Sequence, residues 1–257
     1  MVNKESLKKH ALKATATYDK HATVHRYIAS SLISLVGKEH YKTVLEIGSG
    51  TGILTQFLKE KVECDTLYLN DIAEFPHVNL LGDMDHMDIP KRCNLVVSSS
   101  TLHWSEDLEK LIKKIHKNLR NNGEFVFSLF IEGNLEETAH FNESLKYHTF
   151  DEICEILSKR FLVKLSYTES IEKRFPSPLE ALKEFRNLGI IGESGKVSVG
   201  KIKSFKETKL TYQTAYFVVR KEKKFSFKKL AIKPLSAIRK RISLKKTDGE
   251  GQEESLT

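Results

Sequence analysis

The stretch VLEIGSGTG, residues 44–52, decides the fold of this chain. An apolar run typical of a buried strand leads directly into three glycines at alternate positions, Gly48, Gly50 and Gly52. The residues that follow, ILTQFLKEK, have the spacing of a helix. A bare turn between a parallel strand and a helix lets a ligand approach the main chain at the carboxyl end of the strand. The stretch therefore predicts an α/β fold with a ligand site at this turn.

The rest of the chain continues the alternation of strands and helices. Strand-like segments follow at TLYLND, VNLLGD, NLVVSSS and GEFVFSLF, and the helix EDLEKLIKKIHKNLRNNG is expected to end at Asn122-Gly123. Two longer strand-like segments, LVKLSYTESIEKRF and KLTYQTAYFVVRK, have no crossover helix between them and predict an antiparallel hairpin. The expected fold is a Rossmann-like, seven-stranded, mostly parallel sheet with an antiparallel C-terminal hairpin.

The sequence predicts one domain with two additions and a tail. The domain is expected over residues 1–221, with an N-terminal helical cap over 6–36 and a helical insertion over 176–206. Residues 222–257 are rich in charge and poor in large apolar residues, so we expect them to be disordered.

The tail carries most of the formal net charge of +8. Residues 221–246 contain eleven Lys/Arg and one Glu, whereas residues 247–257 contain four acids and no base. Binding of nucleic acid or of a membrane surface through this tail is the alternative from a different functional class. Nucleic acid is not expected as a partner, because the basic stretch has only two Phe and is interrupted by Pro234.

The number and spacing of the cysteines indicate the redox compartment of the protein. Cys64, Cys93 and Cys154 are odd in number and form no CxxC pair. This pattern favours reduced thiols in a cytoplasm over a disulfide framework or a zinc site.

The glycine pattern separates two classes of ligand. Dinucleotide-binding loops follow GxGxxG, whose third glycine allows close packing of the helix. Here that position is Ile53, and the loop reads GxGxG two residues after the acid Glu46. On these residues the chain resembles the class I S-adenosylmethionine-dependent methyltransferases, and the resemblance implies S-adenosylmethionine as the cofactor.

The resemblance also implies the residues that hold this cofactor. Glu46 suits its cationic end, directly or through water, and Asp71, at the end of TLYLND, suits its ribose hydroxyls. In LGDMDHMDIP, Asp83 resembles the acid that accepts the adenine amino group, with Met84 against the ring. The full set of expected cofactor residues is Glu46, Gly48, Gly50, Gly52, Asp71, Asp83, Met84 and Ser98.

A closer resemblance covers most of the chain, from about residue 15 to residue 221. The segments ATYDKHATVHRYIASSL, NLVVSSSTLHW, FPSPLEALKEFRNLG and LTYQTAYFVVRK resemble the malonyl-acyl carrier protein O-methyltransferases of biotin synthesis. The chain departs from that pattern at Asn94, where the family has an acid, and at Ser99, where it has Asn. The resemblance implies methyl transfer to the free carboxylate of a malonyl thioester. A methyltransferase for another small carboxylate or metabolite is the alternative.

The expected reaction needs positioning groups rather than a base, because a carboxylate is already ionised at neutral pH. Tyr18, His21 and His103 are the candidates to position the acceptor. Tyr18 has an alternative role as a staple between a cap helix and the sheet. Trp104 is expected either to bind the acceptor or to pack as part of a lid.

Three cations near the insertion are candidates to receive an acidic acyl carrier protein. They are Arg174, Lys183 and Arg186. Charges of this kind also occur on any solvated helix face, so the alternative is a structural surface.

No metal is expected. His21 and His25 have a spacing compatible with a metal on a helix, but no third ligand is evident. Asp83, Asp85 and Asp88 lack the central glycine and the terminal Glu of a calcium loop.

Overall fold

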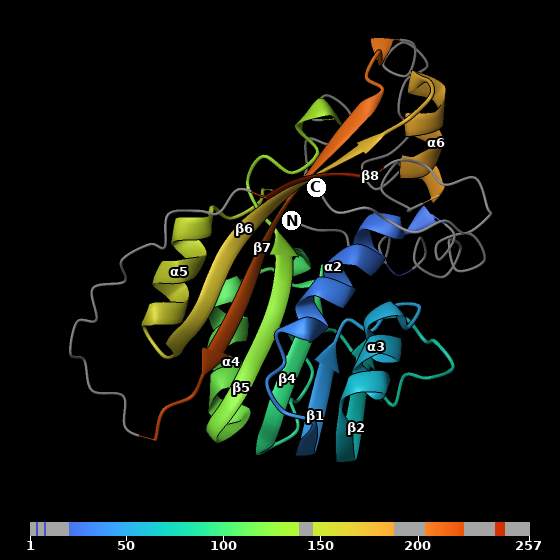
Figure 1. Cartoon of the computed structure of the whole chain (residues 1–257). Coiled ribbons are helices and arrows are strands. Elements are labelled where there is room, and N and C mark those ends of the chain that lie inside the picture. The colour runs from blue at the N-terminus through green and yellow to red at the C-terminus, as the bar shows by residue number, and fades with distance from the viewer. Residues whose placement is uncertain are drawn as a thin grey trace.

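A single eight-stranded sheet organises the chain (Figure 1). The structure, a computed structural model, describes residues 4, 8, 21–138, 146–187, 204–223 and 240–244. The strand order is β3-β2-β1-β4-β5-β7-β6-β8. The strands are β1 (His40–Ile47), β2 (Glu63–Asp71), β3 (Leu80–Leu81), β4 (Cys93–Ser99), β5 (Leu119–Phe130), β6 (Leu162–Arg174), β7 (Lys209–Arg220) and β8 (Lys240–Leu244). β1 to β5 are parallel and β7 is antiparallel to both of its neighbours, so the expected Rossmann-like arrangement is confirmed.

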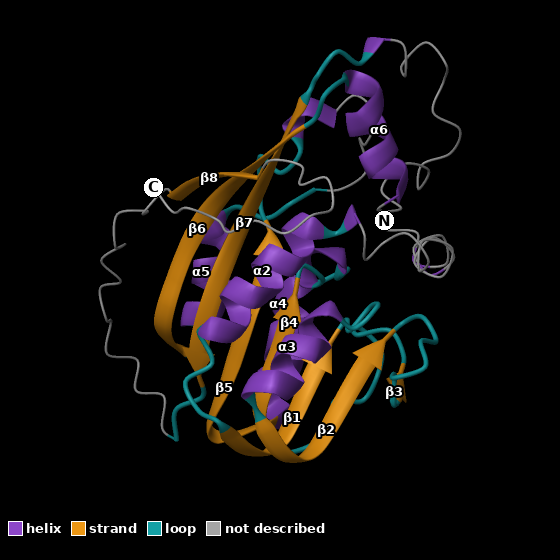
Figure 2. Cartoon of the chain, turned by 45° about the vertical axis from the view of Figure 1, so that its right-hand side comes forward, coloured by secondary structure: helices purple, strands orange, loops and turns teal. Residues whose placement is uncertain are grey.

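Helices cover both faces of the sheet (Figures 1 and 2). They are α2 (Thr23–Ser34), α3 (Ile53–Lys61), α4 (Leu108–Asn118), α5 (Phe150–Ser158) and α6 (Pro178–Asn187), with short 3₁₀ turns η1 (Leu102–Trp104) and η2 (Glu136–Thr138). Successive strand residues point to opposite faces: Val44 packs in the cluster under α2 and α3, whereas Leu45 packs in the cluster under α4 and α5. Because both faces of the parallel strands are buried, their sequences are continuous apolar runs.

Helix α4 ends at Asn118, four residues before the stop expected at Asn122-Gly123. The reason is a cap supplied from a distant strand. The Lys221 ammonium, directly after β7, donates to the main-chain carbonyls of His116, Lys117 and Leu119. These are the carbonyls that a helix end leaves without partners, and the chain is then free to enter β5 at Leu119.

The N-terminal cap and the insertion meet at one buried ion pair. Lys173, near the end of β6, donates to the Thr23 hydroxyl at 2.8 Å, to the His21 carbonyl at 3.3 Å and to the carboxylate of Glu184 in α6. These contacts use all three of the donors that a lysine has. Helix α2 lies within the range expected for the cap, and helix α6 lies within the range expected for the insertion. Residues 9–20 and 188–203 lie outside the described residues.

The tail adds one strand to the sheet. Lys240–Leu244 pairs in parallel with β6 over Glu169–Lys173, although the composition of this segment predicts no structure. The free edge of β6 offers unpaired main-chain groups, which is the physical reason that a polar segment can form a strand there. The other residues after 223 lie outside the described part of the chain. Within the described part, no helix combines the length and the apolar character needed to cross a membrane.

We expect Lys173→Met to destabilise the protein strongly. The side chains of Lys173 and Glu184 are only 9% and 5% exposed, so the substitution leaves a buried carboxylate without its cation. Breaking such a pair costs about 3–5 kcal/mol. Urea unfolding followed by circular dichroism measures the loss.

Two variants make this stability test specific. Lys183→Met removes an exposed ion pair with Glu180 on the same helix and should cost at most about 1 kcal/mol. The double variant Lys173→Met with Glu184→Leu should recover much of the loss. Equal stabilities for Lys173→Met and Lys183→Met would contradict the structural role of the buried pair.

Candidate active site

The candidate site lies at the carboxyl ends of β1, β2 and β4, where the strand order reverses direction. The glycine loop crosses from β1 to α3 and is tied to β2. The N–H groups of Gly48 and Ser49 both donate to the Asn70 carbonyl, at 2.9 and 2.8 Å. The Gly50 N–H donates to Oδ2 of Asp71 at 2.8 Å. The loop and the last residue of β2 therefore form one rigid unit.

Two of the glycines are required for different reasons. Gly48 has φ +73°, and a Cβ there would lie 2.2 Å from Cγ2 of Thr101. Gly50 has φ +52°, but a Cβ there would meet nothing within 4 Å. The first glycine is required by packing inside the protein. The second leaves an open volume above the main chain that a ligand can use.

Glu46 is fully buried beneath the loop. Its Oε2 accepts a hydrogen bond from the Thr55 hydroxyl of α3 at 2.8 Å, whereas its Oε1 has no partner among the described residues. Burial raises the pKa of Glu46 to about 7. A carboxylate in this state binds a cation favourably, because the cation restores the ionised form.

Asp71 ends β2 with both carboxylate oxygens directed at main-chain donors. Oδ2 accepts from Gly50, and Oδ1 accepts from the Ala73 N–H at 2.8 Å. Burial raises the pKa of Asp71, while these two hydrogen bonds oppose the rise. Each oxygen has a second lone pair, so the group can still accept hydroxyl donors from a ligand.

Met84 and Ser98 are both engaged within the protein. Met84 is buried in the core cluster under α4, and its carbonyl accepts from Lys114 at 2.8 Å. The Ser98 hydroxyl is fully buried and donates to the Ile47 carbonyl at 2.8 Å. The structure therefore gives Ser98 a place under the glycine loop, where it holds the end of β1.

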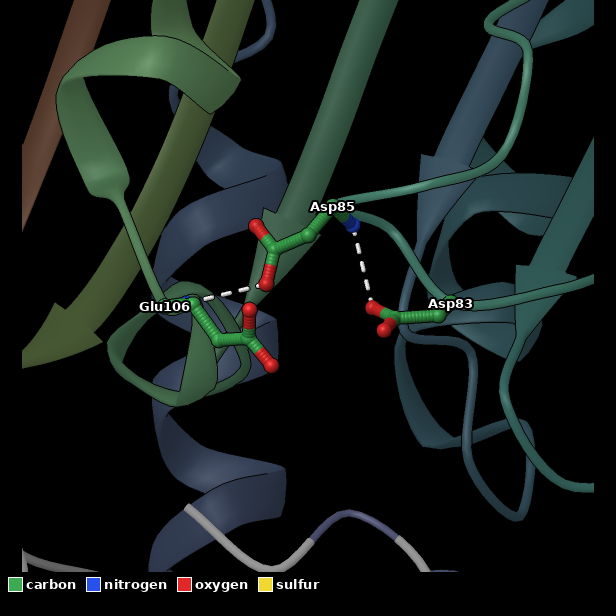
Figure 3. A group of neighbouring side chains, drawn as sticks. All are labelled: Asp83, Asp85 and Glu106. Atoms are coloured by element: carbon green, nitrogen blue, oxygen red, sulfur yellow. Dashed lines mark hydrogen bonds between the residues drawn. The ribbon is translucent and has the colours of Figure 1, made fainter. Parts of the chain in front are cut away.

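Asp83 stands in a group of three carboxylates (Figure 3). Ligand atoms of Asp83, Asp85 and Glu106 lie within 4.8 Å of one another, so the group differs from the sequence trio, which contained Asp88. The ammonium of Lys4 reaches this group from the N-terminus, at 2.8 Å from both oxygens of Asp83 and 2.5 Å from Asp85. A cation of the chain itself therefore offsets part of the negative charge of this group.

Imidazole and aromatic rings gather beside the glycine loop. The His103 ring lies 5.1 Å from Phe130, 5.8 Å from Tyr147 and 5.2 Å from Trp104, between ring centroids. The His25 ring of α2 lies 5.6 Å from the same Phe130. Thr101, two residues before His103, contacts the loop at Gly48. Residues from the cap, from η1 and from β5 are thus brought together next to the loop.

Both histidines of this cluster are neutral at physiological pH. Burial lowers the pKa of His103 to about 3, helped by the charge of His25. Burial lowers the pKa of His25 to about 4, helped by the charge of Lys173. At neutral pH neither ring can deliver a proton as an imidazolium, so the cluster can shape and hydrogen-bond an acceptor.

The cations expected to receive a carrier protein have acidic partners within this chain. Arg174 is exposed and pairs with Glu172 at 3.3 Å, and Lys183 is exposed and pairs with Glu180 at 2.7 Å. The side chain of Arg186 and all of Tyr18 lie outside the described residues. His21 is positioned by its Nδ1, which lies 3.3 Å from Glu184.

Several residues that build this site give no signal in the sequence. Thr55, Thr101 and Lys4 act through contacts with other segments of the chain, and no pattern in the sequence assigns any of them a role. The sequence offers His25 only as half of a metal-compatible pair with His21. The structure instead packs its ring against Phe130.

Comparison with known proteins fits this geometry. A family described as a methyltransferase domain matches residues 18–165, more than half of the chain. The chain belongs to the methyltransferase family. A malonyl-[acyl-carrier protein] O-methyltransferase of Calditerrivibrio nitroreducens is 29% identical over 84% of this chain and 96% of its own. One of Chlorobium phaeovibrioides is 35% identical over 72% of this chain and 79% of its own. The resemblance inferred from the sequence is confirmed.

Solved structures agree with the fold of this methyltransferase. A protein of Bacillus halodurans superposes with a TM-score of 0.59 at 10% identity, over 76% of this chain and 98% of its own. YcgJ of Bacillus subtilis superposes with a TM-score of 0.53 at 14% identity, over 77% and 99%. The methyltransferase uses S-adenosylmethionine. The orphaned Oε1 of Glu46 and the open volume above Gly50 fit that group.

We expect Asp71→Ala to weaken cofactor binding about 30- to 100-fold, because a charged acceptor shared by two hydroxyls contributes roughly 2–3 kcal/mol. The loss of the Gly50 contact adds to the effect. Calorimetric titration with S-adenosylhomocysteine measures it. Asp65→Ala, an exposed acid on the same strand, is the matched control and should bind normally. An unchanged dissociation constant for Asp71→Ala would remove this residue from the site.

We expect the free energy of unfolding to fall as the pH drops from 7.5 to 5. The pKa values of His25 and His103 are lower in the folded state than in the unfolded state, so these two rings take up protons mainly in the unfolded chain in this range. The raised pKa of Glu46 acts in the opposite sense over the same range and offsets part of the fall. At pH 5 each ring should cost about 2 kcal/mol relative to neutral pH. Urea unfolding at both pH values measures the slope.

Replacement of either ring should flatten this pH dependence. His103→Gln and His25→Gln each remove one group that titrates between pH 7.5 and 5 mainly in the unfolded state. His40→Gln, at an exposed position on β1, is the control and should leave the slope unchanged. A wild-type slope in both buried variants would contradict the neutral state of the rings.

Proposed function

We propose that this methyltransferase transfers a methyl group to the free carboxylate of a malonyl thioester carried on acyl carrier protein, a step of biotin synthesis. The observation that carries the proposal is the extent of the similarity. Relatives with this name match up to 88% of the chain, including parts that the general methyltransferase match over residues 18–165 leaves out. Those parts include the hairpin strand β7 and the α6 insertion.

The residues around the glycine loop divide the work of holding the cofactor. Asp71 would accept hydrogen bonds from the ribose hydroxyls, and Asp83 would accept one from the adenine amino group. Glu46 would balance the positive charge at the cationic end of the cofactor. The open space beside Gly50 would let the bound molecule approach the main chain. When bound, S-adenosylmethionine supplies an electrophilic methyl group on a sulfonium cation.

The acceptor side of the site requires no proton transfer. A malonyl carboxylate is ionised at neutral pH, so the protein has only to align it and exclude water. The neutral rings of His103 and His25 support this role. They offer hydrogen-bonding atoms to the malonyl carboxylate, and they carry no positive charge that would compete with the sulfonium group for it. His103 and Trp104, together with Tyr18 and His21 of the cap, are the proposed positioning residues.

The proposed partner is an acidic carrier protein that docks transiently at the insertion. Arg174 and Lys183 are exposed there, and Arg186 belongs to the same helix α6. Since two of these cations already pair with acids of this chain, docking would exchange one set of ion pairs for another. The three free cysteines support a reducing, cytoplasmic location.

We expect methyl transfer to malonyl thioesters and none to acetyl thioesters, which have no free carboxylate. The assay follows transfer of a labelled methyl group from S-adenosylmethionine to malonyl-acyl carrier protein, malonyl-coenzyme A and their acetyl counterparts. The carrier-bound substrate should react faster, and its advantage should shrink at high salt, because rim charges act mainly on association.

Two comparisons identify the source of the preference. Charge reversal of Arg174 and Lys183 to Glu should slow the reaction with the carrier-bound substrate at low salt and leave that with malonyl-coenzyme A unchanged. Methylation of another free acid, with none of malonyl thioesters, would redirect the proposal to a different small carboxylate. Tight binding of nucleic acid or anionic vesicles without methyl transfer would favour a role for the basic tail instead.

A further inference from the structure

Lys4 reaches a carboxylate of the proposed cofactor site from 79 residues away. Its ammonium lies 2.8 Å from both oxygens of Asp83, 2.5 Å from Asp85 and 3.6 Å from Glu106. Its side chain is only 13% exposed. Attraction by Asp83 and Asp85 outweighs the effect of burial and raises the pKa of Lys4, so the group is fully charged.

Asp85 is held for this contact by hydrogen bonds. Asp85 accepts from the Ser105 hydroxyl at 2.5 Å. It also accepts from the Glu106 N–H at 2.9 Å (Figure 3). The loop that carries Asp83 and Asp85 is fixed by Lys114, which donates to the carbonyls of Met84, Asp85 and Met87. The acids therefore form a rigid receptor for a cation.

The acceptor capacity of Asp83 is fully used in this structure. Oδ1 accepts from Lys4 and from the Asp85 N–H, and Oδ2 accepts from Lys4 and contacts His86 Nδ1 at 2.9 Å. A carboxylate has about four lone-pair sites, so a further donor has to replace one of these four. The Asp85 contact is made by the main chain of the loop, and the His86 contact comes from the same loop. Lys4 is the partner that comes from a distant part of the chain, so it can leave without any change in the loop.

Asp83 also lies where the base of a bound nucleoside would end. Asp71 pairs in register with Leu81, and the Gly82 N–H donates to the Asp71 carbonyl at 2.9 Å. Neighbouring strands lie about 4.8 Å apart. A ligand whose ribose is held at Asp71 therefore carries its base towards the next strand end, which is that of Asp83.

We propose that Lys4 is a gating residue for the cofactor and competes with the adenine amino group for Asp83. In the structure Lys4 occupies the Asp83 carboxylate. On binding, the amino group takes over the Asp83 sites, and the ammonium stays near the adjoining Asp85 and Glu106. This inference rests on the proposed roles of Asp71 and Asp83 in cofactor binding.

The test is calorimetric titration of the full-length protein with two ligands. One is S-adenosylhomocysteine, and the other is its analogue with an unsubstituted purine, which has no amino group to donate to Asp83. Lys4→Met should bind S-adenosylhomocysteine about tenfold more tightly than wild type, equivalent to about 1.4 kcal/mol. It should bind the analogue no better than wild type does.

Two variants and a salt series complete the experiment. Lys4→Arg keeps a competing cation and should retain wild-type affinity. Lys8→Met is the matched control, since within the described part of the chain Lys8 pairs with none of these acids. The gain in affinity of Lys4→Met over wild type should shrink between about 50 and about 500 mM salt, because salt screens the attraction between Lys4 and the carboxylates.

The possible outcomes are distinguishable. Unchanged or weaker binding of S-adenosylhomocysteine by Lys4→Met would overturn the gate and leave the cofactor assignment standing. An equal gain for both ligands would show that Lys4 is a steric obstacle and would overturn competition for Asp83. A wild-type protein that binds no S-adenosylhomocysteine would overturn the cofactor assignment and the gate together.

Discussion

The hydrogen bond from the Gly50 N–H to the Asp71 carboxylate is the contact on which the site depends. It joins the turn after β1 to the end of β2, so that the bare main chain and the strand-end acid keep a fixed relation. Thr101 fills the space beside Gly48 and brings the segment after β4 to the same turn. Three neighbouring strands therefore contribute to one rigid platform, and the remaining groups of the site are arranged around it.

Three lysines position the elements around this platform by donating to main-chain or buried acceptors. Lys221 caps α4, Lys114 fixes the loop that carries Asp83, and Lys173 joins the cap to the insertion. Each uses its three donors on three acceptors, as an ammonium can. A charge of this kind has little to do with binding an external partner. It satisfies carbonyl and carboxylate groups that would otherwise be buried without a hydrogen bond.

The electrostatics of the site suit a reaction that moves no proton. Burial keeps His103 and His25 neutral, and it leaves Glu46 close to the boundary between its two protonation states. A neutral wall on the acceptor side and a carboxylate beneath the loop separate the two tasks of the site. In the proposed reaction, one side would orient an anion that is already reactive, and the other would stabilise the positive charge of the methyl donor.

The sequence by itself determined the elements whose signal is local. The glycine pattern after β1, the position of Asp71 at the end of a strand and the alternation of strands and helices follow from neighbouring residues. The antiparallel hairpin follows from the absence of a crossover helix. Only the tertiary structure decided that Ser98 donates to Ile47 and that Lys221 ends α4 early. It likewise decided that Lys4 reaches Asp83. A residue type and its spacing cannot show these contacts, because the direction of a side chain and the identity of its partner depend on the path of the whole chain.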